Sequence, residues 1–307
     1  MFIKFPRELL KVTIPRQQVI DKLSCSYFKR LQMKYTIKDF QREFSDDDIC
    51  LDYLSKQRFG HLEDFDKYYR VTGRKCYAHS ESGKQIHPVA GTIFHKSSTP
   101  LTNWFFAIFL FSQSKNGVSA KELERHLGVT YKCAWRMAKQ IRKLMEDETP
   151  MFSGTVEADE TYIGGKGKNN QRGRGAENKT AVVGIVERKG SVVAKAVPNV
   201  KASTVMPLIR TSVEIGANLM TDEFRSYSKA GNEFNHQTVV HGVKEFVRGD
   251  VHTNTIEGFW SQLKRSIDGT FHQVSPKYLQ AYVNEFAFRY NHLNSSVHVF
   301  DLLLGKI

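Results

Sequence analysis

Residues 155–163 read Thr-Val-Glu-Ala-Asp-Glu-Thr-Tyr-Ile, a run in which β-branched and aromatic residues surround three acidic ones. This composition predicts a strand. Residues 180–187 and 191–197 predict a hairpin of two further strands, and residues 218–221 and 236–241 predict two short strands. Helices are predicted at 202–213, 253–267 and 275–292. The alternation predicts an α/β domain, a mixed sheet flanked by helices.

Three carboxylates stand where these elements would bring acidic side chains together. Asp159 lies within the first strand, Asp222 follows the strand at 218–221, and Glu257 lies early in the helix at 253–267. Such carboxylates are costly to bury unless they are paired or bind a metal. Oxygen ligands suit Mg²⁺ or Mn²⁺, and two such ions support phosphoryl transfer. The pattern does not choose between Asp159 and its neighbours Glu157 and Glu160.

The helix at 253–267 carries further candidates. Asn254 stands one turn before Glu257 and is the second choice as an oxygen ligand. Glu257, Ser261 and Lys264 fall on one helical face, since steps of four and three residues keep direction. Lys264 and Arg265 are therefore expected to contact phosphate close to a metal site.

A glycine-rich loop follows the first predicted strand. Residues 164–175 contain five glycines and four basic residues, Lys166, Lys168, Arg172 and Arg174. Glycines let backbone N–H groups approach phosphates, and basic side chains neutralise them. The loop therefore predicts a DNA contact; the alternative is a solvated hairpin tip.

The first half of the chain contains a helix-turn-helix pattern. After a helix predicted to start at Thr99-Pro100, residues 119–122 form a capping box, Gly128 turns the chain, and Thr130 caps a helix that runs through Met145. The second helix carries residues suited to reach DNA: Tyr131, Lys132, Arg136, Lys139, Arg142 and Lys143. The alternative is a helical hairpin with a basic solvent face.

Composition agrees with a nucleic-acid partner. The 307 residues include 45 Lys+Arg and 32 Asp+Glu, for a net charge of +13. Residues 1–150 account for +9 (26 minus 17) and residues 151–307 for +4 (19 minus 15). Such a balance favours polyanionic partners, although a merely solubilising surface would look the same.

Other function classes are disfavoured. The longest apolar run, at 104–111, has eight residues, against roughly 20 for a membrane span. No secretory signal is visible, and the four cysteines are scattered without a CxxC pair, so we expect reduced thiols and a cytoplasmic, nucleoid-associated protein.

Several stretches together resemble the bacterial insertion-sequence transposases of the DDE superfamily, in the group with an N-terminal zinc ribbon, a helix-turn-helix and a ribonuclease-H-like catalytic domain. The resemblance covers roughly residues 35–292. It rests on five segments: Ala90-Gly-Thr-Ile-Phe94, Leu127-Gly-Val-Thr-Tyr131 with Ala134-Trp-Arg136, Val156-Glu-Ala-Asp-Glu-Thr-Tyr-Ile-Gly-Gly165, His252-Thr-Asn-Thr-Ile-Glu-Gly-Phe-Trp260 and Glu285-Phe-Ala-Phe-Arg-Tyr-Asn291.

The resemblance implies that Asp159, Asp222 and Glu257 are the metal-binding triad. The 35-residue step from Asp222 to Glu257 is typical of that superfamily. Some relatives have Asn or His in place of the third acid, which keeps Asn254 under consideration. The resemblance also implies binding of terminal inverted repeats, 3′-end cleavage and strand transfer with two Mg²⁺ or Mn²⁺ ions, and a homo-oligomer that holds two double-stranded DNA ends.

One departure concerns the zinc ribbon. Relatives carry two CxxC pairs before the 90–94 segment, whereas here the first pair is missing around residues 60–65 and the second pair's positions hold His79 and Ser82. Cys76 and His79 remain, but four ligands at ribbon spacing are absent, so we expect a ribbon without zinc.

These interpretations divide the chain into an unassigned extension at 1–34, a helical segment with a degenerate ribbon at 35–98, a helix-turn-helix region at 99–150 and a catalytic domain at 151–307. The predicted function is DNA transposition. The alternatives are an inactive or domesticated relative that acts as a DNA-binding regulator, and a ribonuclease-H-like nuclease without strand transfer.

Overall fold

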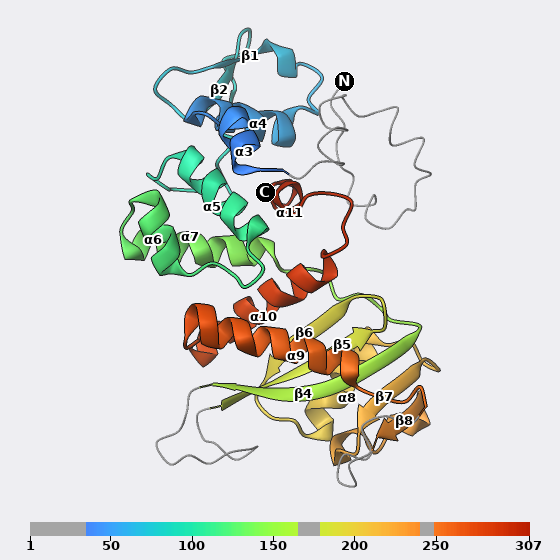
Figure 1. The fold of residues 1–307 in the computed structure, drawn as a ribbon. Coiled ribbons are helices and arrows are strands. Elements are labelled where there is room, and N and C mark those ends of the chain that lie inside the picture. Colours follow the sequence, from blue (N-terminus) through green and yellow to red (C-terminus); the bar gives the residue numbers. More distant parts are fainter. Residues whose placement is uncertain (1–34, 165–178, 240–248) are drawn as a thin grey trace. The chain divides into compact units, whose positions relative to one another are not determined.

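The computed structural model describes residues 35–164, 179–239 and 249–307 (Figure 1). The chain divides into two compact units. Among the described residues, the first contains residues 35–114, 120–144 and 295–307, and the second contains residues 115–119, 145–164, 179–239 and 249–294. The predicted boundary between residues 150 and 151 lies close to residue 145, where the second unit resumes. The predicted catalytic segment 151–307, however, extends past its end, because residues 295–307 belong to the first unit.

The first unit is mainly helical. Its helices are α3 (Ile37–Glu43), α4 (Asp47–Phe59), α5 (Leu101–Gln113), α6 (Ala120–Leu127), α7 (Tyr131–Leu144) and α11 (Val299–Gly305). Helix α11 returns here because Phe300 is fully buried among aromatic rings of the unit, 5.5 Å from Tyr35 and 5.9 Å from Phe40 between ring centroids. Aromatic pairs of this kind add to the energy of apolar burial. The C-terminal residues therefore complete the core of the first unit.

The segment for which the resemblance implies a ribbon-like β unit, within residues 35–98, contains a small antiparallel sheet. Its strands are β1 (Tyr68–Arg70), β2 (Tyr77–His79) and β3 (Gln85–Ile86), in the order β1-β2-β3. The predicted start of α5 needs a correction, because Pro100 occupies the N-cap position and makes no side-chain cap. Asp47 supplies the missing acceptor: its Oδ1 accepts from the Thr102 N–H at 2.9 Å.

The predicted pair of helices after residue 119 is also present. Gly128 separates α6 from α7 with φ +62°, in the left-handed region that glycine adopts without a steric penalty. Thr130 then caps α7 by accepting from the Cys133 N–H at 3.3 Å. Arg142 differs from expectation: only 4% exposed, it lies over the Phe111 ring at 5.2 Å and so faces the core.

The second unit is an α/β domain, as predicted. Its strands are β4 (Thr155–Gly164), β5 (Lys179–Glu187), β6 (Val192–Val197), β7 (Asn218–Asp222) and β8 (Asn235–Val239), in the order β6-β5-β4-β7-β8. Strand β4 pairs antiparallel with β5 and parallel with β7, and β7 pairs parallel with β8. This five-stranded mixed sheet is consistent with the ribonuclease-H-like domain that the resemblance implies.

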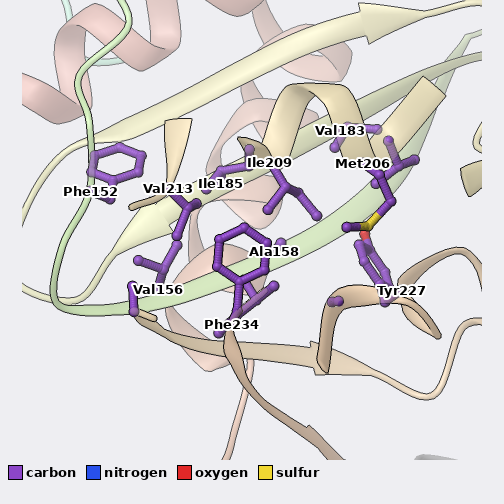
Figure 2. Packing of buried hydrophobic residues seen from close by; sticks show 14 of the residues in the cluster. Phe152, Val156, Ala158, Val183, Ile185, Met206, Ile209, Val213, Tyr227 and Phe234 are labelled. Atoms are coloured by element: carbon purple, nitrogen blue, oxygen red, sulfur yellow. The ribbon is translucent and has the colours of Figure 1, made fainter. Parts of the chain in front are cut away.

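Helices cover both faces of this sheet (Figure 1). Helix α8 (Ala202–Ser212) packs on one face, over the apolar cluster in Figure 2 that includes Val156, Ala158, Ile185 and Ile209. Helices α9 (Asn254–Ser266) and α10 (Pro276–Asn291) pack on the other face, over a second cluster that includes Val182. A π-helical turn at Ile267–Phe271 follows α9. The side-chain alternation of β4 therefore decides which face each of its acids meets.

Candidate active site

Asp159 lies in the middle of β4 on the face covered by α9 and α10. Val156 and Ala158 point to the α8 side, so the alternation of the strand sends Glu157 and Asp159 to the opposite side. Asp159 is paired in the ladder with Gly184 of β5. The carboxylate is thus held at the centre of the sheet, under the helices.

Trp260 of α9 reaches down to this carboxylate. Its indole N–H donates to Asp159 Oδ2 at 3.0 Å. The ring passes directly over Gly184, where a Cβ would lie 2.5 Å from the Trp260 side chain. Because real Cβ atoms do not approach so closely, the glycine opposite Asp159 makes room for the tryptophan that binds it.

Asp222 ends β7, the strand that runs parallel to β4. Its Oδ1 accepts from the Phe224 N–H at 3.0 Å, which orients the half-buried carboxylate at the C-terminal end of the strand. Glu257 lies in the first turn of α9, where its Oε1 accepts from the Thr253 hydroxyl at 3.1 Å. Glu257 is exposed.

The three carboxylates are linked electrostatically through Asp159. The pKa of Asp159 is raised from 3.8 to about 6, first by burial and then by the negative charges of Asp222 and Glu257. Hydrogen bonds from the Glu160 backbone and Trp260 act in the opposite direction. Within the described residues, no three His, Cys, Asp or Glu side chains are arranged closely enough to hold a metal ion. The structure therefore brings the predicted triad into one electrostatic neighbourhood without forming a closed coordination shell.

Glu157 anchors α9 to the sheet. This carboxylate is fully buried and accepts from Arg188 Nε at 2.7 Å, from the N–H groups of Thr255 and Ile256 at 2.8 and 3.0 Å, and from the Thr255 hydroxyl at 2.9 Å. Free N–H groups in the first turn of a helix favour such a negative partner. Glu157 therefore fixes the helical turn that carries Glu257.

The two secondary candidates, Glu160 and Asn254, have partners of their own. Glu160 points to the α8 side of β4 and accepts from the Tyr227 hydroxyl at 3.1 Å, because the alternation of a strand places neighbouring side chains on opposite faces. Glu160 therefore lies on the face of β4 opposite to Asp159. Asn254 is the exposed first residue of α9, and its backbone N–H donates to His252 Nδ1 at 3.4 Å.

The expected DNA-contacting residues form two described groups. Lys132 and Lys139 are exposed on α7, whereas Arg136 is half-buried and donates to the His95 carbonyl at 3.1 Å. In the second unit, Lys264 and Arg265 are exposed near the end of α9. The four loop residues, Lys166, Lys168, Arg172 and Arg174, lie outside the described residues.

The small sheet β1-β2-β3 has its own hydrogen bonds at His79, where the resemblance implies a zinc ligand in relatives. His79 Nδ1 accepts from the N–H groups of Glu81 and Ser82 at 3.2 and 3.1 Å. On the other side of the ring, Nε2 lies 3.0 Å from Asp64 Oδ2. Cys76 is buried, with its sulfur 4.0 Å from Gln85 Oε1. His79 thus pairs with a carboxylate.

Reasoning from the sequence missed three parts of this site. No local sequence pattern indicates the roles of Trp260, Gly184 and Arg188, because these roles depend on which strands and helices pack together. The sequence does predict that Glu157 and Asp159 lie on one face of β4 and Glu160 on the other, since side chains alternate between the two faces of a strand.

Comparisons with known proteins agree with this architecture. Residues 151–291 match the ISXO2-like transposase domain. The chain is 29% identical over 240 residues to an uncharacterized protein in transposable element ISH50 of Halobacterium salinarum, covering 72% of this chain and 79% of that protein. It is 32% identical over 104 residues to an uncharacterized transposase-like protein of Haemophilus influenzae, covering 34% of this chain and 83% of that protein.

No solved structure matches the chain. Among the helices of the described residues, none is both long and apolar enough to cross a bilayer.

Proposed function

Because the chain belongs to the ISXO2-like transposase family, we propose that it cleaves the ends of a DNA element and joins them to target DNA, with Asp159, Asp222 and Glu257 as its catalytic carboxylates. The observation that carries this assignment is the raised pKa of Asp159. Buried negative groups are normally separated or neutralised, yet here two further carboxylates raise the cost of ionising Asp159. Perturbed groups of this kind cluster at functional sites.

The chemistry of the three donors, although not their spacing in this structure, suits divalent cations. All three side chains offer carboxylate oxygens, which Mg²⁺ and Mn²⁺ prefer, and a cation among them would offset the burial and the charge repulsion that together raise the pKa of Asp159. Bound in pairs, such ions activate an attacking oxygen and stabilise a leaving oxygen in phosphoryl transfer. Asp159, Asp222 and Glu257 would hold them.

The remaining residues of the site orient these ligands. Trp260 holds one oxygen of Asp159, and the Phe224 N–H holds one oxygen of Asp222. Glu157 ties the first turn of α9 to β4 and so limits the movement of Glu257 relative to Asp159. Preorganised ligands lower the cost of reaching the reactive geometry.

DNA would be held by basic side chains in each unit. Exposed Lys264 and Arg265 follow Glu257 along α9 and would contact phosphates flanking the reacting bond. Lys132, Arg136 and Lys139 on α7 would bind the terminal repeats, with Arg136 exchanging its His95 contact for DNA. Because transposition acts on two ends, the active species would be a homo-oligomer on double-stranded DNA.

The test is Mg²⁺-dependent cleavage of DNA that carries the inverted repeats flanking the gene. The native chain should cut at the repeat end and leave a 3′-hydroxyl, and Asp222→Ala should not. The exposed Asp268→Asn serves as a matched control and should cut normally. Equal cleavage by native and Asp222→Ala proteins, or no cleavage by either, would refute the catalytic assignment, and the second result would favour the regulator.

A further inference from the structure

An open cavity of about 400 Å³ lies in the second unit at the C-terminal ends of the parallel strands β4 and β7. Two half-buried aromatic side chains, Tyr162 and Phe224, form part of its wall together with two lysines, Lys179 and Lys201. In sheets with parallel strands, ligands bind outside the carboxyl ends of those strands. The cavity is also within the size range of small-molecule sites.

The walls of the cavity are built from hydrogen-bonded loops. Asn199 Oδ1 accepts from the Lys201 N–H at 3.0 Å and from the Thr204 hydroxyl at 2.9 Å. The Ser226 hydroxyl donates to the Val200 carbonyl at 2.5 Å, which ties the loop before α8 to the turn after β7. The loop backbone around the cavity is therefore held in place.

The chemistry of the wall selects the kind of occupant. Tyr162 and Phe224 offer flat apolar surfaces, and every nucleobase can stack on such a surface. Lys179 and Lys201 supply positive charge, and none of the described residues lining the cavity is Asp or Glu. A planar group attached to an anion matches this combination. A nucleotide contains both, a planar base and a negatively charged phosphate.

The cavity lies on the α8 face of the sheet, opposite to Asp159, and is linked to the candidate catalytic centre through Phe224. The backbone N–H of Phe224 donates to Asp222 Oδ1 at 3.0 Å, so one residue both lines the cavity and donates its amide to a candidate catalytic carboxylate. An occupant of the cavity would therefore lie near the end of β7, against the residue that holds Asp222.

We propose that this cavity receives one unpaired nucleotide of the DNA substrate. Its base stacks against Phe224 and Tyr162, and its phosphate lies between Lys179 and Lys201. The proposal rests on the proposed function, because it assumes a DNA substrate. It adds that the strand is unpaired beside Asp222, which the carboxylates alone do not require.

The experiment uses the full chain and a short single-stranded oligonucleotide with one 2-aminopurine, in EDTA so that no cleavage occurs. Stacking on an aromatic ring quenches 2-aminopurine fluorescence, so we expect the native chain to quench it. Phe224→Ala should lose the quenching and bind about tenfold more weakly or worse, whereas Phe224→Tyr should retain both. Circular dichroism verifies that each variant is folded.

The lysines provide an independent readout. Lys201→Ala should reduce the salt dependence of binding by about 0.7 in the log–log slope, the amount expected for one lost phosphate contact on a single strand. The matched control is Lys229→Ala, an exposed lysine of the same unit outside the cavity wall. If Phe224→Ala does not fold, the comparison of Lys201→Ala with Lys229→Ala tests whether the cavity binds the nucleotide.

Failure of this proposal is distinguishable from failure of the proposed function. Glu257→Gln should abolish cleavage and still quench 2-aminopurine as the native chain does. Absence of quenching by the native chain overturns the proposal, as does native-like quenching by folded Phe224→Ala or an equal salt slope for the Lys201→Ala and Lys229→Ala proteins. These quenching and salt-slope results are independent of whether the chain cleaves DNA.

Discussion

The indole N–H of Trp260 donates to the carboxylate of Asp159 at 3.0 Å, across the one residue of β5, Gly184, that leaves space for the ring. This contact joins the helix that carries Glu257 to the strand that carries Asp159. It also favours the ionised form of a carboxylate whose pKa is otherwise raised by burial and by neighbouring charges.

Removal of this indole hydrogen bond should shift the pH dependence of cleavage. Trp260→Phe keeps an aromatic ring over Gly184 but loses the donor, so the pKa of Asp159 should rise further and the acid limb of the cleavage profile should move to higher pH. We expect about a 10- to 100-fold loss of activity, as for other partners of metal ligands. Trp135→Phe, in the other unit, is the control; an unmoved acid limb for Trp260→Phe would show that the contact has no such role.

A methyl group at Gly184 should displace Trp260. Gly184→Ala places a Cβ 2.5 Å from the ring, and overpacking of this kind costs about 1–3 kcal/mol of the free energy of unfolding. Gly258→Ala is the matched control: its Cβ meets nothing within 4 Å and it lies inside α9, so it should stabilise the chain by about 0.5–1 kcal/mol. Urea unfolding and tryptophan fluorescence measure both, and similar stabilities for the two variants would contradict the packing described.

Loss of the Glu157 carboxylate should destabilise the second unit more than loss of an exposed acid. Glu157→Ala leaves the Arg188 charge and the first N–H groups of α9 without their buried partner, which should cost about 3–5 kcal/mol. Glu157→Gln keeps an oxygen for the helix and should cost less. The exposed Glu214→Ala should stay within about 0.5 kcal/mol of the native chain in the same unfolding experiment. Equal effects of Glu157→Ala and Glu214→Ala on the free energy of unfolding would show that Glu157 does not anchor α9 to the sheet.

The stability of the metal-free chain should depend on the protonation of Asp159. Folding raises the pKa of this group from 3.8 to about 6, so the folded state binds the proton more tightly than the unfolded state. The resulting contribution to the free energy of unfolding is at most about 3 kcal/mol. It is fully present below pH 3.8 and is lost as the pH rises through 6. Asp159→Asn should therefore be more stable than the native chain at pH 7.5, with the gain disappearing by pH 4. Thermal melting across this range measures the difference, and parallel curves would show that Asp159 is not perturbed.

Much of the fold follows from local patterns in the sequence. The strands of the mixed sheet, the pair α6 and α7, and the helix bearing Glu257 all have the periodicity or capping residues of their elements. The return of α11 to the first unit does not follow, because Phe300 packs against Tyr35 from the far end of the chain. The start of α5 was misassigned for a similar reason: its acceptor, Asp47, comes from another helix.

The candidate site shows the same division. Asp159, Asp222 and Glu257 were predictable as candidates because each has a distinct place in its own strand or helix. The pairing of Trp260 with Asp159 was not, since it requires both the register of β5 on β4 and the position of α9 above them. The burial of Glu157 likewise depends on α9 and Arg188, which meet it only in the folded chain.

The most direct test of the catalytic assignment compares two neighbouring acids of β4 in the same assay. Asp159→Asn and Glu160→Gln each replace one carboxylate by its amide, and the amide introduced by Glu160→Gln retains an oxygen to accept from the Tyr227 hydroxyl. Mg²⁺-dependent cleavage of DNA carrying the element ends should fall on the order of a thousandfold for Asp159→Asn, the equivalent of several kcal/mol of transition-state stabilisation, and stay within a few-fold of native for Glu160→Gln. Native-like cleavage by Asp159→Asn, or a greater loss for Glu160→Gln, would contradict the account.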